Sequence, residues 1–239
     1  MDKKLRLKLL NKERDFCFPD EGNTATHIHN ILTGKIYPVV QLKNFSPTQI
    51  IDVGANIGAA AIYFHDKYPS AQITCFEPCS KSVKYLSKNL SNIEHTTIKP
   101  YGLLDKSQSA TLLAGKSQCL QHSIFTSVEV SESGEKIQIE DAFAEIESIA
   151  NDQTLLKVDT EGCEFQILSS VKQLFNQLQV IYLEFHSEKD RIKIDELLNH
   201  THGLCRANVS TPHRGDLCYV HRSLWENDSE ISQWEISSE

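Results

Sequence analysis

Short apolar runs alternate with longer amphipathic stretches along the middle of this chain. The apolar runs have the length and aliphatic content of buried strands, and they lie at residues 50–54, 72–78, 154–160 and 180–186. The amphipathic stretches have the length of helices and lie at residues 59–68, 80–90 and 164–175. Strands that alternate with helices in this way are typical of βαβ units, so the pattern predicts an α/β fold with a mainly parallel sheet.

The segment between the second and third of these helices is less regular. Residues 96–103 predict a strand that Pro100 interrupts, which suits a sheet edge or a bulge because proline cannot donate to a strand ladder. Residues 109–114 predict a short strand. Residues 115–135 predict a long exposed loop or hairpin, which is either a lid over a binding site or a solvated excursion.

Near its C-terminal end the pattern predicts a reversal of strand direction. A helix near residues 188–202 precedes two short apolar segments, 206–210 and 217–222, which are expected to pair antiparallel. We therefore predict a Rossmann-like domain with a mainly parallel seven-stranded sheet and an antiparallel C-terminal hairpin strand. The 239 residues suffice for one sizeable core. We expect an N-terminal extension of helix and loop at residues 1–45, which is a candidate substrate cap. The domain itself would cover residues 46–225, and a tail would cover residues 226–239.

Basic side chains crowd residues 1–14. They predict a solvated first helix or a frayed start, and a basic amphipathic helix lying on a membrane is the less favoured alternative. The segment lacks the apolar core of a signal peptide, and no apolar run in the chain approaches the ~20 residues that span a bilayer. We therefore expect a cytoplasmic protein without stable membrane association.

Charge and cysteine content narrow the function classes. The net charge of −8 argues against a general nucleic-acid binder, because neutralising phosphates requires a basic surface. The seven cysteines lack the dense spacing of a disulfide scaffold, and no second close pair accompanies Cys75 and Cys79. Free thiols are therefore favoured over disulfides or a zinc site.

A glycine-rich turn follows the first buried strand. Gly54 and Gly58 let the backbone approach a ligand closely, and the helix that begins after them offers unpaired amides. Asn56 lies within this turn. Asp52 lies at the tip of the strand before it, where a carboxylate can face a cationic group of a ligand. A tight connection between strand and helix, without a ligand, is the alternative interpretation.

An acidic residue at the end of the next strand strengthens the case for a ligand. Glu77 lies 23 positions after Gly54, where a carboxylate accepts hydrogen bonds from two adjacent ribose hydroxyls in nucleotide-binding α/β folds. The turn reads G-x-N-x-G, whereas dinucleotide folds use G-x-G-x-x-G to seat a pyrophosphate. This pattern favours a ligand without phosphates, such as the sulfonium and amino-acid portion of S-adenosylmethionine.

Several motifs together resemble one enzyme family. DVGANIG at 52–58 with FEP at 76–78 resembles the first two motifs of class I methyltransferases. LLKVDTEGCEFQIL at 155–168 is close to the K-x-D-x-E-G-x-E run of FkbM-family methyltransferases. Further similar stretches are YGLLDKSQSATL at 101–112, IEDAFAEI at 139–146 and IYLEFH at 181–186. The resemblance covers roughly residues 48–190, and the tail with the two last strands resembles the family only loosely.

The resemblance implies a fold, a cofactor and a reaction. The fold would be the Rossmann-like class I methyltransferase fold, and the methyl donor would be S-adenosylmethionine. The cofactor-binding residues would be Asp52, Gly54, Asn56, Gly58, Glu77, Pro78, Gly102 and Asp105. The usual acceptor in the family is a hydroxyl oxygen.

Acidic residues and a histidine follow the last two parallel strands. Asp159, Glu161 and His186 are expected to line the acceptor pocket, with His186 or a carboxylate as the general base that a weak alcohol nucleophile needs. Alternatively, Glu161 and Glu164 are helix-start carboxylates that bind backbone amides. A divalent metal on Asp159, Glu184 and His186 is a further, less favoured alternative, and our expected site contains no metal.

The sequence therefore predicts an S-adenosylmethionine-dependent methyltransferase that methylates a hydroxyl of a small-molecule natural product or sugar. The expected partner is a small-molecule or glycan acceptor rather than a nucleic acid. The alternatives are an N-methyltransferase, a non-catalytic subunit that binds an adenosyl ligand and, less favoured, an NAD-dependent oxidoreductase. The sequence does not specify the oligomeric state.

Overall fold

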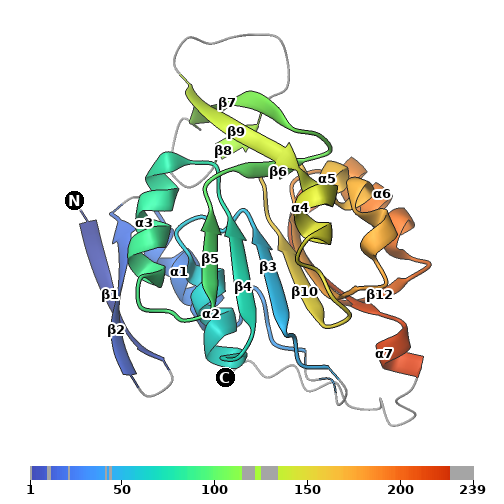
Figure 1. Ribbon diagram of the computed structural model, residues 1–239, viewed down its shortest axis with the longest axis horizontal. Helices are drawn as coiled ribbons and strands as arrows, with labels where there is room; N and C mark the ends of the chain where they lie inside the picture. Colours follow the sequence, from blue (N-terminus) through green and yellow to red (C-terminus); the bar gives the residue numbers. More distant parts are fainter. Residues whose placement is uncertain are drawn as a thin grey trace.

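A computed structural model describes residues 2–9, 12–20, 22–40, 42, 45–114, 122–124 and 134–226 of the chain. Its centre is a seven-stranded sheet with helices on both faces (Figure 1). The strands follow the order β12-β13-β11-β10-β3-β4-β5. Their bounds are β3 Gln49–Val53, β4 Gln72–Phe76, β5 Thr96–Lys99, β10 Thr154–Val158, β11 Leu178–Phe185, β12 His202–Thr211 and β13 Arg214–His221.

Strand directions confirm the predicted topology. The five strands from β11 to β5 run parallel, β13 pairs antiparallel with β11, and β12 pairs antiparallel with β13. Strands β3, β10 and β11 are buried along their whole length because they lie in the interior of the sheet. The carboxyl ends of the parallel strands therefore meet at one edge of the sheet, where the reversed strand β13 begins.

Two hydrophobic clusters cover the two faces of the sheet. Ile50 and Ile51 are adjacent in β3 and belong to different clusters, since neighbouring side chains of a strand point to opposite faces. The helices that pack on these faces are α1 Thr24–Leu32, α2 Ala59–Lys67, α3 Ser80–Leu90, α4 Ala142–Glu147, α5 Glu164–Ser170, η1 Lys172–Leu174, α6 Glu188–Leu198 and α7 Ser223–Glu226. Within the described residues, none of the helices has both the length and the apolar character needed to cross a membrane.

The N-terminal segment departs from the prediction. Instead of a first helix, β1 Asp2–Leu9 and β2 Lys12–Pro19 form an antiparallel hairpin beside α3 (Figure 1). The reason is a period of two: Leu5 and Leu7 alternate with basic residues, and both leucines pack against the core while the basic side chains face solvent. Leu5 lies opposite the buried Phe16, which fixes the register.

The predicted strand 96–103 divides at Pro100. Its first part, β5, forms the edge of the central sheet, as the proline suggested. Its second part, β6 Gly102–Leu104, joins a separate four-stranded sheet with β7 Gln108–Ala114, β8 His122–Ile124 and β9 Glu135–Asp141. This smaller sheet lies across one end of the central sheet (Figure 1). Most of the expected loop 115–135 and all of the tail beyond residue 226 lie outside the described residues.

Candidate active site

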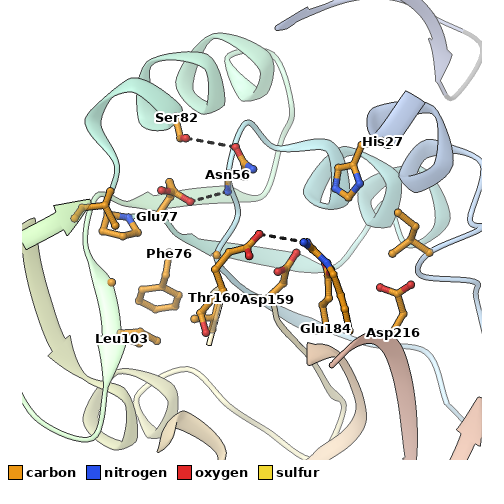
Figure 2. A pocket seen from close by; sticks show the side chains of 18 of the residues that line it. His27, Asn56, Phe76, Glu77, Ser82, Leu103, Asp159, Thr160, Glu184 and Asp216 are labelled. Atoms are coloured by element: carbon orange, nitrogen blue, oxygen red, sulfur yellow. Dashed lines mark hydrogen bonds and ion pairs between the residues drawn. The ribbon is translucent and has the colours of Figure 1, made fainter. Parts of the chain in front are cut away.

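A cavity of ≈ 440 Å³ lies at the carboxyl ends of the parallel strands. One half of its wall comes from the ends of β3 and β4 and from β6, and it contains Gly54, Asn56, Phe76, Glu77, Pro78 and Gly102. The other half comes from α1 and from the ends of β10, β11 and β13, and it contains His27, Asp159, Glu161, Glu184, Arg214 and Asp216. Figure 2 shows Asp159 between these two groups, with Glu77 on one side and Asp216 on the other.

The glycine-rich turn between β3 and α2 is fixed by the neighbouring strands. The amides of Gly54 and Ala55 donate to the carbonyl oxygen of Phe76 at 2.9 and 3.0 Å. Gly54 has a φ of +77°, and a Cβ at this position would lie 1.8 Å from the carbonyl oxygen of Asp159. Glycine is therefore required here both for backbone conformation and for the close approach of two strand ends.

Substituting Gly54 by alanine should consequently destabilise the fold. Left-handed backbone alone costs an alanine about 1–2 kcal/mol, and the contact with Asp159 forces the strand ends apart as well, so we expect a total loss above about 3 kcal/mol. Gly162→Ala is the matched control, because Gly162 also has a positive φ but a Cβ there meets nothing within 4 Å. Equal losses of melting temperature in the two variants would contradict the steric explanation.

Glu77 joins the two turns that follow β3 and β4. Its Oε2 accepts a hydrogen bond from the amide of Asn56 and its Oε1 from the amide of Cys79, both at 2.8 Å. Burial raises the pKa of Glu77 to about 7, although these two hydrogen bonds oppose the shift. Each carboxylate oxygen has a second lone pair, so this side chain is held in place with the capacity to accept further hydrogen bonds from a ligand.

A buried ion pair lies directly behind the cavity. The Nζ atom of Lys157 lies 2.9 Å from Oδ1 of Asp52 and donates to the carbonyl oxygen of Gly54 at 2.7 Å. Lys157 is 3% exposed and Asp52 is fully buried. Burial favours a neutral amine, but the carboxylates of Asp52 and Asp159 outweigh it and raise the pKa of Lys157. Asp52 thus does not line the cavity. It pairs with Lys157, which in turn binds the carbonyl oxygen of Gly54 in the turn.

Asp159 connects this ion pair to the cavity. Its Oδ2 lies 3.8 Å from Nζ of Lys157 and accepts a hydrogen bond from Oη of Tyr37 at 3.2 Å. Burial, together with the charge of Glu184, raises the pKa of Asp159 to about 8, against the opposing influence of Lys157 and His186. The carboxylate is thus poised to exchange a proton near neutral pH.

His186 is enclosed by carboxylates. Its Nε2 lies 3.1 Å from Glu161 and 3.6 Å from Glu184, and its Nδ1 lies 3.2 Å from Glu164. Burial favours the neutral ring, but these three carboxylates outweigh burial and raise the pKa of His186 to about 12. A ring that carries a proton on both nitrogens has no lone pair, which argues against His186 as the general base.

Glu161 and Glu164, the two glutamates of the K-x-D-x-E-G-x-E run, have different surroundings. Oε1 of Glu164 accepts hydrogen bonds from the amides of Thr160 and Gly162 at 2.9 and 3.0 Å, so its interpretation as a helix-start carboxylate is confirmed. Glu161 instead lines the cavity and has a φ of +55°, an unusual conformation for a residue other than glycine. It pairs with His186 and, at 3.4 Å, with Arg214.

The metal alternative can be tested on the donor set. Ligand atoms of Asp159, Glu184 and His186 lie within 4.8 Å of one another. However, Glu184 already contacts the guanidinium of Arg214, and both ring nitrogens of His186 face carboxylates of Glu161, Glu164 and Glu184. All three side chains thus already take part in ion pairs, so a divalent cation would compete with Lys157, Arg214 and the ring of His186 for these carboxylates.

The remaining predicted residues divide between the wall and its support. Gly54, Asn56, Glu77, Pro78, Gly102, Asp159 and Glu161 line the cavity, whereas Asp52, Gly58, Asp105 and His186 do not. Gly58 precedes α2 and packs against Leu86, and Asp105 is exposed beyond β6. Sequence reasoning missed Tyr37, Arg214 and Asp216. They lie outside the recognised motifs and have no diagnostic spacing from them, and only the fold brings them to the site.

Comparison with known proteins gives one family match and several similar structures. Residues 52–213 match the model of the methyltransferase FkbM domain. A segment of 61 residues, 26% of this chain, is 41% identical to the methyltransferase sdnD of Sordaria araneosa, of which it covers 23%. The match to the curated relative is therefore confined to less than a quarter of that protein.

Two solved structures share the fold. The methyltransferase FkbM from Methylobacillus flagellatus aligns with a TM-score of 0.53 at 14% identity, over 73% of this chain and 44% of that one. Aeropyrum pernix fibrillarin, solved with natively bound S-adenosyl-L-methionine, aligns with a TM-score of 0.51 at 11% identity, over 91% of this chain and 82% of that one. At these identities the likeness concerns the fold alone.

Proposed function

This chain belongs to the FkbM methyltransferase family, and on that premise we propose that it transfers a methyl group from S-adenosylmethionine to a hydroxyl oxygen of a small molecule or sugar. The observation that carries the proposal is the cavity itself. A glycine-rich turn with a buried carboxylate, Glu77, forms one half, and the other half contains Asp159, a carboxylate whose pKa is raised to about 8. Donor and acceptor would then meet at Asp159.

The donor is proposed to occupy the half of the cavity near β3 and β4. Glu77 would accept the two ribose hydroxyls, and the turn at Gly54 and Asn56 would face the amino-acid portion. The side chains of Phe76 and Leu103 offer an apolar surface for the adenine ring. When bound, S-adenosylmethionine supplies a methyl carbon made electrophilic by a positive sulfur.

Glu77→Ala should therefore weaken donor binding. Two lost hydrogen bonds at about 1–1.5 kcal/mol each correspond to roughly a hundredfold rise of the dissociation constant for S-adenosylmethionine and S-adenosylhomocysteine. Isothermal calorimetry with both ligands and with NAD measures this, and Glu147→Ala, an exposed position on α4, is the control. Preferential binding of NAD by the wild type would contradict the proposed donor and favour an oxidoreductase.

Proton removal from the acceptor is the step that this chain's own residues would perform. An alcohol oxygen is a weak nucleophile at neutral pH, so its proton must leave as the oxygen attacks. Asp159 would accept that proton, because it lines the cavity and its pKa lies near 8. Glu161 and Glu184 are held by Arg214 and His186, so they would shape the pocket rather than take the proton.

The acceptor half of the cavity favours a small polar acceptor over a nucleic acid. Four acidic side chains face it, Asp159, Glu161, Glu184 and Asp216, against the single guanidinium of Arg214 among the lining residues. Such a wall disfavours phosphates and offers oxygens that accept hydrogen bonds from hydroxyl groups. His27 of α1 also lines this half, which supports residues 1–45 as a cap over the acceptor.

A further inference from the structure

The side chain of Asp159 is held by a residue outside the family match. Tyr37 precedes β3, whereas the family model matches residues 52–213. Oη of Tyr37 donates to Oδ2 of Asp159 at 3.2 Å, and Nζ of Lys157 approaches the same oxygen to 3.8 Å. One hydrogen bond and one ion pair thus converge on the same carboxylate oxygen from the side of the core.

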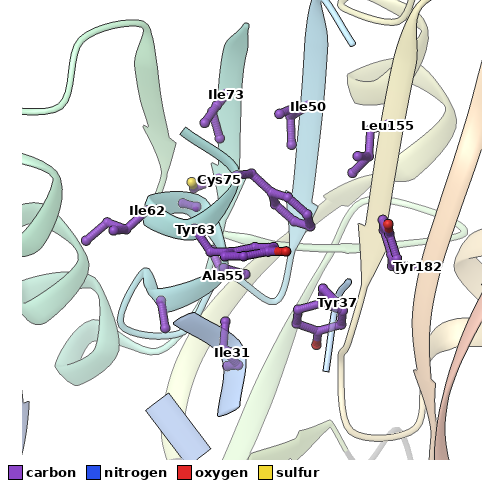
Figure 3. Packing of buried hydrophobic residues seen from close by; sticks show 14 of the residues in the cluster. Ile31, Tyr37, Ile50, Ala55, Ile62, Tyr63, Ile73, Cys75, Leu155 and Tyr182 are labelled. Atoms are coloured by element: carbon purple, nitrogen blue, oxygen red, sulfur yellow. The ribbon is translucent and has the colours of Figure 1, made fainter. Parts of the chain in front are cut away.

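The ring of Tyr37 is fixed by its surroundings. The residue is 1% exposed, and its ring centroid lies 6.2 Å from that of Phe64 and 5.9 Å from that of Tyr182. Figure 3 shows Tyr37 and Tyr182 within this cluster of buried side chains. Because aromatic packing leaves the ring of Tyr37 little freedom, its hydroxyl group is held in a fixed position next to Asp159.

The hydroxyl of Tyr37 serves as a donor at every physiological pH. Burial, followed by the charge of Asp159, raises its pKa well above the ordinary value. A hydrogen bond donated to a carboxylate stabilises the charged form and orients it. Within the described residues, Oδ1 of Asp159 accepts no comparable hydrogen bond, so this second oxygen stays available to a group in the cavity.

We propose that Tyr37 is a positioning residue for methyl transfer: together with Lys157 it holds Oδ2 of Asp159, so that Oδ1 is presented to the acceptor hydroxyl. The inference rests on the proposed function, in which Asp159 is the base. The N-terminal extension would then contribute to catalysis by positioning Asp159. The segment that carries Tyr37 follows α1, and residues of α1 line the acceptor half of the cavity.

Other charged groups also act on Asp159 and belong in any test of its titration. They are Lys157 on β10, Glu161 in the loop after it, Glu184 on β11, His186 directly after β11, and Arg214 on β13. Tyr37→Phe leaves all of these groups in place and retains the packed ring. A change in the titration of Asp159 in this variant therefore reports the lost hydroxyl alone.

Carbon-13 NMR of protein labelled at the aspartate carboxyl carbon tests this directly. The resonance of Asp159 is assigned from its absence in Asp159→Asn, and all proteins are titrated with S-adenosylhomocysteine bound. We expect the pKa of Asp159 to rise by about one unit in Tyr37→Phe, because the charged form loses a donor. Tyr219→Phe is the matched control, since this buried tyrosine also contacts an aspartate, Asp195, away from the cavity.

Kinetic measurements then distinguish a positioning role of Tyr37 from a general loss of active-site structure. With an acceptor found among hydroxyl compounds, Tyr37→Phe should react about tenfold more slowly than wild type below pH 8 and recover above pH 9, since only the deprotonated base acts. An unchanged pKa of Asp159, or a rate lowered equally at every pH, would overturn the role of Tyr37. Full activity of Asp159→Asn would instead overturn the proposed function and leave the measured titration intact.

Discussion

Replacing Asp159 by asparagine is expected to lower the rate of methyl transfer about 10²–10⁴-fold while the affinity for S-adenosylmethionine changes little. The amide has the shape of the carboxylate and can still accept the hydrogen bond from Tyr37, but it cannot take a proton from the acceptor. Turnover of a hydroxyl acceptor, measured beside calorimetry of the donor, distinguishes the two effects. In the wild type the rate should rise with pH through about 8, because the deprotonated form of Asp159 is the active one.

Asp216→Asn is a suitable control for this experiment, since Asp216 lines the same cavity and is not the proposed base. We expect it to alter the Michaelis constant of the acceptor more than the turnover rate. If Asp159→Asn kept wild-type turnover at all pH values, the base would have to be another group. Tight donor binding without turnover of any tested acceptor by the wild type would favour the non-catalytic alternative.

The second large effect concerns stability. Lys157→Met is expected to destabilise the fold by about 3–5 kcal/mol, because it leaves the buried charge of Asp52 without its partner. Lys157 also donates to the carbonyl oxygen of Gly54, so the turn between β3 and α2 loses a support at the same time. Thermal unfolding should show a drop in melting temperature on the order of 10 °C for a chain of this size.

A double variant identifies the origin of that loss. Asp52→Asn combined with Lys157→Met removes both charges, so it should recover a large part of the stability lost in the single variant. If the double variant were less stable than Lys157→Met alone, the unpaired carboxylate could not be the main cause. The packing of the lysine side chain would then account for the effect.

The half of the cavity near β3 and β4 could be predicted from the sequence because its determinants are local. A buried strand, a glycine turn and an acidic residue at the end of the next strand each occupy a few consecutive positions, and the fold confirms the order in which they meet. Gly54 follows β3 and Glu77 follows β4. Because these two strands are adjacent and parallel, their ends meet, and Glu77 accepts a hydrogen bond from the amide of Asn56. The central sheet was predicted for the same reason, as periods of two and 3.6 are local properties.

The other half of the cavity could not be predicted in the same way. Tyr37 and Arg214 reach the cavity from opposite ends of the chain, and nothing in their sequence neighbourhoods marks the partners that they contact. His186 lies beside the acidic residues but does not line the cavity, and its protonation depends on the three carboxylates that surround it in space. The N-terminal hairpin was not predicted, because the alternation of Leu5 and Leu7 with basic residues spans only a few positions and the same basic composition also suits a solvated helix.

The reversal of strand β13 has a consequence for how such an enzyme can change. Strand β13 runs antiparallel to β11, which belongs to the parallel part of the sheet. The first residues of β13, including Arg214 and Asp216, therefore lie where the parallel strands end. The turn between β12 and β13 immediately precedes Arg214, so residues inserted at 212–213 change the surroundings of Arg214 without interrupting a parallel strand or the turn at Gly54. Under the proposed function, new acceptor specificity would arise by remodelling this one loop, while the turn at Gly54 and the surroundings of Asp159 are inherited unchanged.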